Sequence, residues 1–348
     1  MHFLLKIKKR ERIMGKTYIP EGYISRLSIY DTQKAIELIK SNFAQKLSEA
    51  LNLCRISAPL FVGSNTGIND DLNGTERPVK FDIKSSNTEA VVVHSLAKWK
   101  RLALWKYEFN EGEGMYTDMN AIRRDEDLDN LHSVYTDQWD WEKVITKEDR
   151  TTEYLQKTVS AIVGAICDTL DIVKSHYPQL TVTLEREVCF ITSQELEDKY
   201  PTLDSKQREY EITKEKKTVF ISQIGDKLKS GKSHDGRAPD YDDWTLNGDI
   251  LFWDDVLDCQ IEISSMGIRV DRDSLISQLE KANANDRLSF YFHSLLADGT
   301  LPLTMGGGIG QSRLCMLLLE KAHIGEVQSS IWDDVTIEEC KKKGVNLL

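Results

Sequence analysis

The sequence predicts an α+β protein in which a mainly antiparallel sheet is flanked by helices. Short apolar and β-branched runs alternate with longer segments of helical periodicity, and no internal repeat, low-complexity segment or Pro- or Ser-rich linker divides the chain. The 348 residues are 40% hydrophobic, enough to bury a large core without disulfides or a metal. We therefore expect a single domain over residues 31–348, preceded by a leader over residues 1–30 that is poorly ordered at its start.

The charge of the chain favours a small-molecule partner. Lys and Arg number 45 against 56 Asp and Glu, so the formal net charge is −11. Because nucleic-acid binding depends on cations that displace counterions from phosphates, we expect no nucleic-acid partner. The six cysteines form no C-x-x-C pair and several lie in apolar runs, which is typical of reduced thiols in the cytosol.

No targeting or membrane segment stands out. The basic residues near the N-terminus follow a short apolar patch, which is the wrong order for a secretory signal. No window approaches the roughly 18 apolar residues of a membrane span. The sequence therefore predicts a cytoplasmic protein without a membrane partner.

Helical periodicity begins at Asp31. The apolar residues that recur on one face are Ile36, Ile39, Phe43, Leu47 and Leu51. Asp31 or Thr32 is available as the N-cap of this helix. The helix runs into a strand-like segment, 54–61, whose Pro59 lacks a ladder donor and so belongs at a sheet edge or strand end. A dimer seam and an ordinary surface helix over a sheet edge explain this arrangement equally well.

Strands and helices then alternate along the chain. Strand-like runs are expected at 79–83, 89–93, 115–122, 133–141, 217–224, 248–253 and 259–270. Helices are expected at 94–109, 151–174 and 193–215. The strands at 115–122 and 133–141 flank a charged turn at 123–130, so these residues form a strand-loop-strand unit.

A glycine-rich stretch is the strongest local signal. Residues 306–310 contain four glycines, and Gln311-Ser312-Arg313 and the apolar run 314–319 follow at once. We interpret the glycines as a flexible loop that opens a helix, with Arg313 in its first turn. Exposed N–H groups at a helix start attract anions, so the stretch predicts a polyphosphate site.

Three separated segments share one chemistry. Arg123 and Arg124 lie in the strand-loop-strand unit, Asp249 and Glu262 lie on two strands, and Arg313 follows the glycines. Cations at both ends of a triphosphate, with carboxylates for Mg²⁺ between them, are what attack at the α-phosphate requires. The sequence therefore predicts a nucleotide cage that uses ATP and Mg²⁺.

These segments also resemble a known class of enzymes. The run 124–128, ending sixteen positions later at Asp140, resembles the second signature motif of class II aminoacyl-tRNA synthetases, particularly the aspartyl type. Residues 306–314 resemble the third motif, and the first helix with Pro59 resembles the first. Residues 249–251 and 262–269 resemble the magnesium-bearing strands and arginine of that subgroup. The resemblance implies a class II synthetase-like catalytic domain with a six- or seven-stranded antiparallel sheet, working as a homodimer.

Longer matches resemble the ammonia-dependent asparagine synthetase family. They are the segments 94–101, 112–117, 132–135, 137–142, 237–244 and 246–251. That family resembles a synthetase core without a tRNA-reading domain. The resemblance implies that ATP activates the side-chain carboxylate of L-aspartate as a β-aspartyl-adenylate and releases diphosphate. Ammonia then displaces AMP and gives L-asparagine.

The resemblance also implies roles around the nucleotide. Arg123 would contact the α-phosphate and the aspartate carboxylate, although Arg124 fits the motif spacing equally well. Arg313 would lie against the adenine face and the phosphates, and Asp242 would contact the nucleotide. Asp249 and Glu262 would hold Mg²⁺. The neighbouring Asp240 and Asp243 are expected in a solvated acidic turn.

For aspartate, the resemblance implies two cations, Lys100 and Arg269, for the two carboxylates. Gln138 and Asp140 would hold the α-ammonium, while Ser95 and Ser265 would add neutral hydrogen bonds. The catalytic set is completed by Asp70, which either attracts ammonium and takes its proton or only orders a turn or the substrate amine.

Two rival functions remain open from the sequence. One is a tRNA-dependent aspartyl or asparaginyl synthetase, which the acidic charge and the lack of room for an anticodon module disfavour. The other is a catalytically silent paralogue that binds amino acid or nucleotide. Retention of the motif arginines, the metal acids and the substrate residues argues against it.

Overall fold

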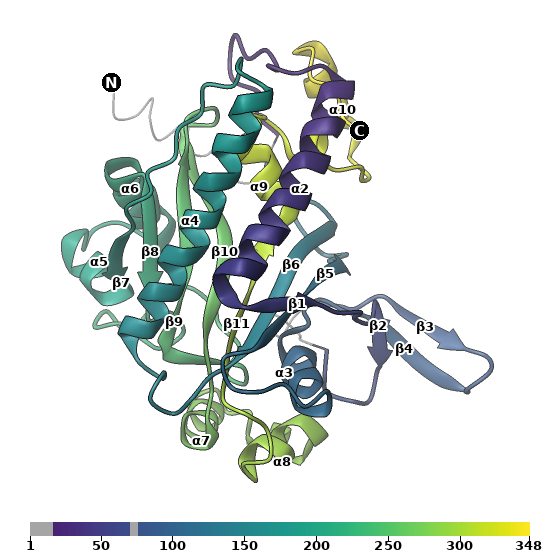
Figure 1. Ribbon diagram of the computed structural model, residues 1–348, viewed down its shortest axis with the longest axis vertical. Helices are drawn as coiled ribbons and strands as arrows, with labels where there is room; N and C mark the ends of the chain where they lie inside the picture. The colour runs from purple at the N-terminus through teal and green to yellow at the C-terminus, as the bar shows by residue number, and fades with distance from the viewer. Residues whose placement is uncertain (1–16, 70–75) are drawn as a thin grey trace.

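The computed structural model describes residues 17–69 and 76–348, and its central feature is a large twisted sheet (Figure 1). In this part of the chain eight strands form that sheet in the order β1-β5-β6-β11-β10-β9-β8-β7. The strands are β1 (Leu53–Arg55), β5 (Gly114–Ile122), β6 (Tyr135–Val144), β7 (Cys189–Thr192), β8 (Thr218–Ser222), β9 (Asp242–Asp254), β10 (Cys259–Arg269) and β11 (Thr304–Gly310).

The interior of the sheet is antiparallel, as predicted, whereas both edges are parallel. β1 pairs with β5 and β7 pairs with β8 in the parallel sense. A parallel neighbour needs a crossover, and two helices, α5 (Ser193–Lys199) and α6 (Ser205–Lys216), supply it between β7 and β8. With these two parallel edge strands, the sheet has eight strands, whereas six or seven were expected.

A second, small sheet projects from the body of the molecule (Figure 1). It has the order β2-β4-β3, formed by β2 (Phe61–Gly63), β3 (Lys80–Ile83) and β4 (Thr88–Val92). The single strand expected at 54–61 is therefore wrong: β1 ends at Arg55, β2 begins at Phe61, and Pro59 lies between them. A proline cannot donate to a ladder, so the chain leaves one sheet and enters the other there.

Helices cover the faces and one end of the large sheet. The remaining ones are α2 (Ile29–Leu51), α3 (Ala97–Lys106), α4 (Thr152–His176), α7 (Arg272–Lys281), α8 (Tyr291–Ala297), α9 (Gln311–Leu318) and α10 (Asp334–Lys342), with 3₁₀ turns η1 (Asn285–Ser289) and η2 (Ile324–Glu326). α2 and α4 run side by side across one face (Figure 1). None of the helices in the described residues combines the length and apolarity that crossing a membrane would require.

The first long helix has the predicted apolar face but a different start. Ile39, Phe43 and Leu47 are fully buried, and the Phe43 ring lies 4.6 Å from that of Trp139 on β6. The helix begins earlier than predicted, because Ser28 is the N-cap and its Oγ accepts the N–H of Asp31 at 3.1 Å. The predicted cap at Asp31 or Thr32 is therefore wrong.

The chain before α2 packs against distant segments. Tyr18 and the buried Asn130 exchange hydrogen bonds of 2.8 and 2.7 Å, and the Tyr23 hydroxyl donates to Glu326 at 3.0 Å. The expectation that the leader is poorly ordered at its start falls on residues 1–16, which lie outside the described residues. All six cysteines are free thiols, and four of them are buried.

The buried His323 gives a prediction about stability. Its Nδ1 accepts the N–H of Gly325 at 3.0 Å, and burial lowers the pKa of the imidazole from 6.5 to about 4. Between these values the unfolded chain binds a proton that the folded chain does not. The free energy of unfolding must therefore fall as the pH decreases through this window, by about 3.5 kcal/mol at roughly 1.4 kcal/mol per pKa unit.

We expect His323→Asn, which keeps a hydrogen-bond acceptor at the cap, to lose less stability across this window than the unsubstituted protein. Urea denaturation at about pH 7 and about pH 4.5 measures the two losses. Equal losses in both proteins would assign the acid sensitivity to other groups.

Candidate active site

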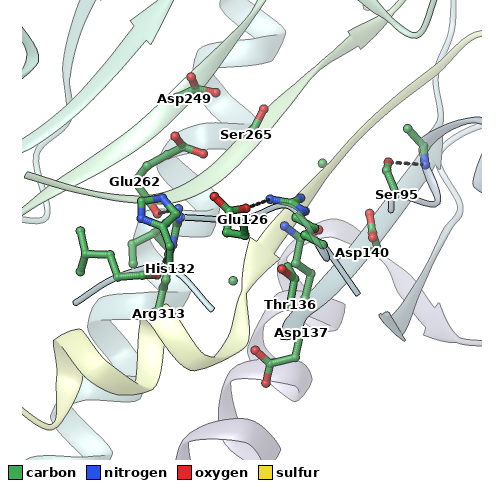
Figure 2. Close-up of a pocket in the computed structure, with 18 of the residues that line it drawn as sticks. Ser95, Glu126, His132, Thr136, Asp137, Asp140, Asp249, Glu262, Ser265 and Arg313 are labelled. Atoms are coloured by element: carbon green, nitrogen blue, oxygen red, sulfur yellow. Dashed lines mark hydrogen bonds and ion pairs between the residues drawn. The ribbon is translucent and has the colours of Figure 1, made fainter. Parts of the chain in front are cut away.

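The predicted site residues come together around one cavity of about 440 Å³ on the sheet. Of the predicted set, those that line it are Ser95, Lys100, Arg123, Arg124, Gln138, Asp140, Asp242, Asp249, Glu262, Ser265, Arg269 and Arg313. Figure 2 shows Arg313 and His132 at one end of the cavity and Ser95 and Asp140 at the other. Asp70 lies outside the described residues.

Side chains of strand β6 alternate between the core on one face of the sheet and the site on the other. Trp139 and Trp141 are almost completely buried in the main core, where the Trp139 ring meets Phe43 of α2. Gln138, Asp140 and Glu142 therefore share the opposite face, because side chains alternate along a strand. One strand thus supplies both a core face and a polar site face.

The glycine-rich stretch is a strand, so its interpretation as a flexible loop is wrong. β11 pairs with β6 on one side and β10 on the other, and places Gly306, Gly308 and Gly310 opposite Glu142, Asp140 and Gln138. A Cβ on Gly306 would overlap the Glu142 carboxylate, and one on Gly308 would lie 2.5 Å from Gln138 Oε1. The glycines therefore leave room for the polar side chains of β6.

The helix after this strand does begin where predicted, with Arg313 in its first turn. An anion already lies at its start, because the Ser312 N–H donates to Asp137 Oδ1 at 3.1 Å. Asp137 is buried and is also 3.1 Å from Lys40 Nζ. This N–H is therefore occupied by a protein carboxylate, whereas Gly310, Ser312 and Arg313 line the cavity. Polyphosphate binding at this helix start stays a prediction.

Buried charges form the floor of the Asp140 end. The Arg269 guanidinium donates to Glu142 through Nε and Nη2, at 3.0 and 2.7 Å, and to Asp242 through Nη1. Lys100 Nζ donates to Asp140 Oδ1 and lies 3.9 Å from Glu142. Burial would raise the pKa of the Glu142 carboxyl, but Arg269 and Lys100 hold it below its ordinary value. Glu142 and Arg269 therefore form a buried ion pair beneath the cavity.

Two carboxylates and an arginine meet on β9 and β10. Asp249 and Glu262 point into the cavity from neighbouring strands, with Ser265 beside them (Figure 2). Arg237 Nη2 donates to Asp249 Oδ1 at 2.6 Å. Burial raises the pKa of the Asp249 carboxyl to about 6, with Glu262 adding to the rise and Arg237 opposing it. The excess of negative charge favours a cation here.

Arg313 forms the wall at the other end. Its Nη1 donates to the Glu262 carbonyl at 3.0 Å and its Nε approaches the Leu131 carbonyl at 3.4 Å. These bonds fix the guanidinium plane against the cavity. Of the two adjacent arginines, Arg123 is partly buried and its buried Nε has no hydrogen-bond partner among the described residues, whereas Arg124 is exposed.

The expectation of a solvated acidic turn at Asp240 and Asp243 is wrong. Asp240 is fully buried and contacts Lys98, Arg287 and His293 at 3.1, 2.9 and 2.9 Å. Asp243 is buried against Arg150 at 2.9 Å. A run of acids is normally solvated, but here cations from distant elements compensate the cost of burial.

Three residues at the site were not predicted from the sequence. Glu142 lies beneath the cavity, where it holds Arg269, and it follows Asp140 at the strand period of two, so it lies on the same face. Arg237 and Lys206 line the cavity. Arg237 begins the matched segment 237–244, but no local signal gives it or Lys206 a role, because only the tertiary fold brings them to the sheet.

Comparison with known proteins gives consistent matches. The family model described as aspartate-ammonia ligase matches residues 30–344. An aspartate--ammonia ligase of Clostridium tetani is 56% identical over 345 residues, covering 99% of this chain and 100% of its own. One of Lactobacillus johnsonii is 58% identical, covering 95% and 99%.

Solved structures share the fold. The asparaginyl-tRNA synthetases of Pyrococcus horikoshii and Entamoeba histolytica, both complexed with asparaginyl-adenylate, match with TM-scores of 0.61 and 0.59 at 16% identity. The matches cover 86% of this chain but only 68% and 66% of theirs, so the chain spans about two thirds of their length. The fold is therefore that of the class II aminoacyl-tRNA synthetases. The sequence matches, which extend over nearly the whole chain, place it in the aspartate–ammonia ligase family.

Proposed function

We propose that this protein uses ATP to amidate L-aspartate with ammonia, forming L-asparagine, AMP and diphosphate through a β-aspartyl-adenylate. The observation that carries the proposal is the convergence of the predicted residues on one cavity in a chain of the aspartate–ammonia ligase family. The cavity has cations for two carboxylates at one end and arginines for a nucleotide at the other.

Aspartate would bind at the end formed by Lys100, Asp140 and Arg269. A guanidinium has five N–H donors. Glu142 and Asp242 accept one N–H from each of the three nitrogens of Arg269. One N–H on Nη1 and one on Nη2 are therefore left for a substrate carboxylate. Asp140 Oδ2 is buried and has no hydrogen-bond partner among the described residues, so it can accept a hydrogen bond from the α-ammonium of aspartate.

The nucleotide would bind between Arg313 and Arg123. A guanidinium plane fixed by two carbonyls offers a flat cation for stacking on adenine. Arg123 is favoured over Arg124 for the α-phosphate because it is the less exposed of the two and has an unpartnered Nε. Asp242 would contact the nucleotide from a fixed position, because Arg269 holds its carboxylate.

The carboxylates of Asp249 and Glu262 fit Mg²⁺ bound together with phosphates. No cluster of three or more metal-binding side chains occurs in residues 17–69 and 76–348. Mg²⁺ typically takes one or two protein carboxylates and completes its shell with water and substrate phosphates. When bound, Mg²⁺ would neutralise charge on the departing diphosphate.

The proposed reaction needs no nucleophilic side chain, because the protein's main task is to align the substrates. A free carboxylate resists ammonia because its own charge repels electrons and oxide is a poor leaving group. Activation by ATP replaces oxide with AMP. The protein then holds the adenylate so that ammonia reaches the side-chain carbonyl, which is a matter of orientation and charge stabilisation.

The direct test is product analysis with ATP, Mg²⁺, L-aspartate and ammonium, omitting aspartate and ammonium in turn. We expect asparagine and AMP in equal amounts only in the complete mixture. Aspartate-dependent exchange of diphosphate into ATP without asparagine would favour a tRNA-charging enzyme. No reaction with any combination would favour a silent paralogue.

Asp70 is proposed as the carboxylate that attracts ammonium and, acting as a base, takes its proton. We expect Asp70→Asn to slow asparagine formation more than adenylate formation, because only the second step uses ammonia. Rates of asparagine release and of aspartate-dependent ATP–diphosphate exchange separate the two steps. Equal loss of both would instead favour the alternative that Asp70 only orders a turn or the substrate amine.

A homodimer in the cytoplasm is the proposed assembly and location. The edge strand β1 and exposed apolar residues of the projecting sheet, Leu60, Phe61 and Phe81, offer a surface for a second copy. Light scattering after size-exclusion chromatography tests the mass. No nucleic acid or membrane is proposed as a partner.

A further inference from the structure

Arg237 is a cation of the cavity to which no role has yet been given. It precedes β9, and its side chain is only 10% exposed. Its Nη1 donates to Ser265 Oγ and its Nη2 to Asp249 Oδ1, both at 2.6 Å. Its Nε is buried and has no hydrogen-bond partner among the described residues. The guanidinium therefore bridges β9 and β10 inside the site.

Under the proposed function, both hydrogen-bond partners of Arg237 would also bind a ligand. Asp249 would ligate Mg²⁺, and Ser265 would bind aspartate. An Mg²⁺ ion on Asp249 would compete with Arg237, because two cations close to one carboxylate oxygen repel each other. Binding of Mg·ATP would therefore weaken the contact between Asp249 and this arginine.

A neighbouring cation of the same cavity does not share this property. Lys206 Nζ lies 3.2 Å from Glu209 and 3.0 Å from Asp235, which are not the proposed metal acids, and Glu262 acts on it only at longer range. Its two ion-pair partners therefore remain available to it when metal binds. Arg237 is the cation whose carboxylate partner is contested by the metal.

We propose that Arg237 is a phosphate-binding residue that exchanges Asp249 for phosphate oxygens when Mg·ATP enters. The inference rests on the proposed function. Each charge stays compensated through the exchange: Asp249 passes from guanidinium to metal, and the guanidinium passes to phosphate. Arginine suits this role because its planar fork binds two oxygens at once, and Nε supplies a further donor. The exchange also frees Ser265 Oγ for aspartate.

A double-mutant cycle tests the exchange by nucleotide binding alone. ATP binding is measured by calorimetry in EDTA, without aspartate or ammonia, for the unsubstituted protein, Asp249→Asn, Arg237→Gln and the double variant. Asp249→Asn releases Arg237 without metal, so we expect it to raise the affinity for ATP by about tenfold or more. In the Arg237→Gln background the same substitution is expected to raise it by less than about threefold.

Glu262→Gln is the matched control, because it removes the same charge from the same pair of strands without a hydrogen bond to Arg237. Its effect on ATP affinity is expected to be equal in both backgrounds. An equal gain from Asp249→Asn in both backgrounds would overturn the proposal, since charge removal alone would then explain it. Thermal unfolding verifies that each variant is folded, and Arg237→Lys replaces Arg237→Gln if the latter is not.

Failure of this inference and failure of the proposed function have different signatures. If the unsubstituted protein forms asparagine but the cycle shows no coupling, the function stands and Arg237 is only structural. If the cycle shows coupling but no asparagine forms, the site binds nucleotide as inferred and the reaction is wrong.

Discussion

Replacing Gly306 with alanine is expected to lower asparagine synthesis at least about 100-fold and to destabilise the protein by about 3–5 kcal/mol. A Cβ at this position would overlap Glu142 Oε2 and lie 2.6 Å from Arg269 Nη2. Neither partner can retreat without breaking a buried ion pair. Activity at saturating substrates and urea denaturation measure the two effects.

The same strand supplies the controls. A Cβ on Gly310 would come no closer than 3.3 Å to the Arg313 side chain, so Gly310→Ala is expected to cost at most about 1 kcal/mol. A Cβ on Gly308 meets only the tip of Gln138, so Gly308→Ala is expected to raise the KM for aspartate while the protein stays folded. Similar effects at all three positions would contradict the role given to Gly306.

Arg269→Lys is expected to lower kcat/KM for aspartate about 100- to 1,000-fold while the KM for ATP changes less than about threefold. Lysine keeps the charge but cannot donate to Glu142 and Asp242 at once and still offer fixed N–H groups to a substrate. Two charge-assisted hydrogen bonds of about 1.5–3 kcal/mol each are at stake. Steady-state kinetics with each substrate varied in turn gives both parameters.

Arg208→Lys is the matched control for this substitution. Arg208 is also buried and paired, 3.1 Å from Glu197, but it does not line the cavity. We expect its kcat/KM for aspartate to stay near that of the unsubstituted protein. If Arg269→Lys also keeps normal kinetics for aspartate, a different cation binds the substrate carboxylate.

Most of the helices and strands, and most of the residues that line the cavity, can be predicted from the sequence. The long helix before the sheet, the strands on either side of the charged turn, and the paired strands with Asp249 and Glu262 follow from periodicities of 3.6 and 2. The period of two also places Gln138, Asp140 and Glu142 on one face of β6. These are local properties, so the chain shows them without a structure.

The roles of the glycines and of the buried charges become visible only in the folded chain. Glycine has no side chain and hence no periodicity, so a loop and a strand look alike at 306–310 until β6 and β10 are seen on either side. Likewise, the Ser312 N–H at the start of α9 is paired because Asp137 lies beside it. Asp240 is buried because Lys98, Arg287 and His293 surround it. Whether a charge is paired depends on residues distant in sequence, because burial and compensation are set by the folded chain.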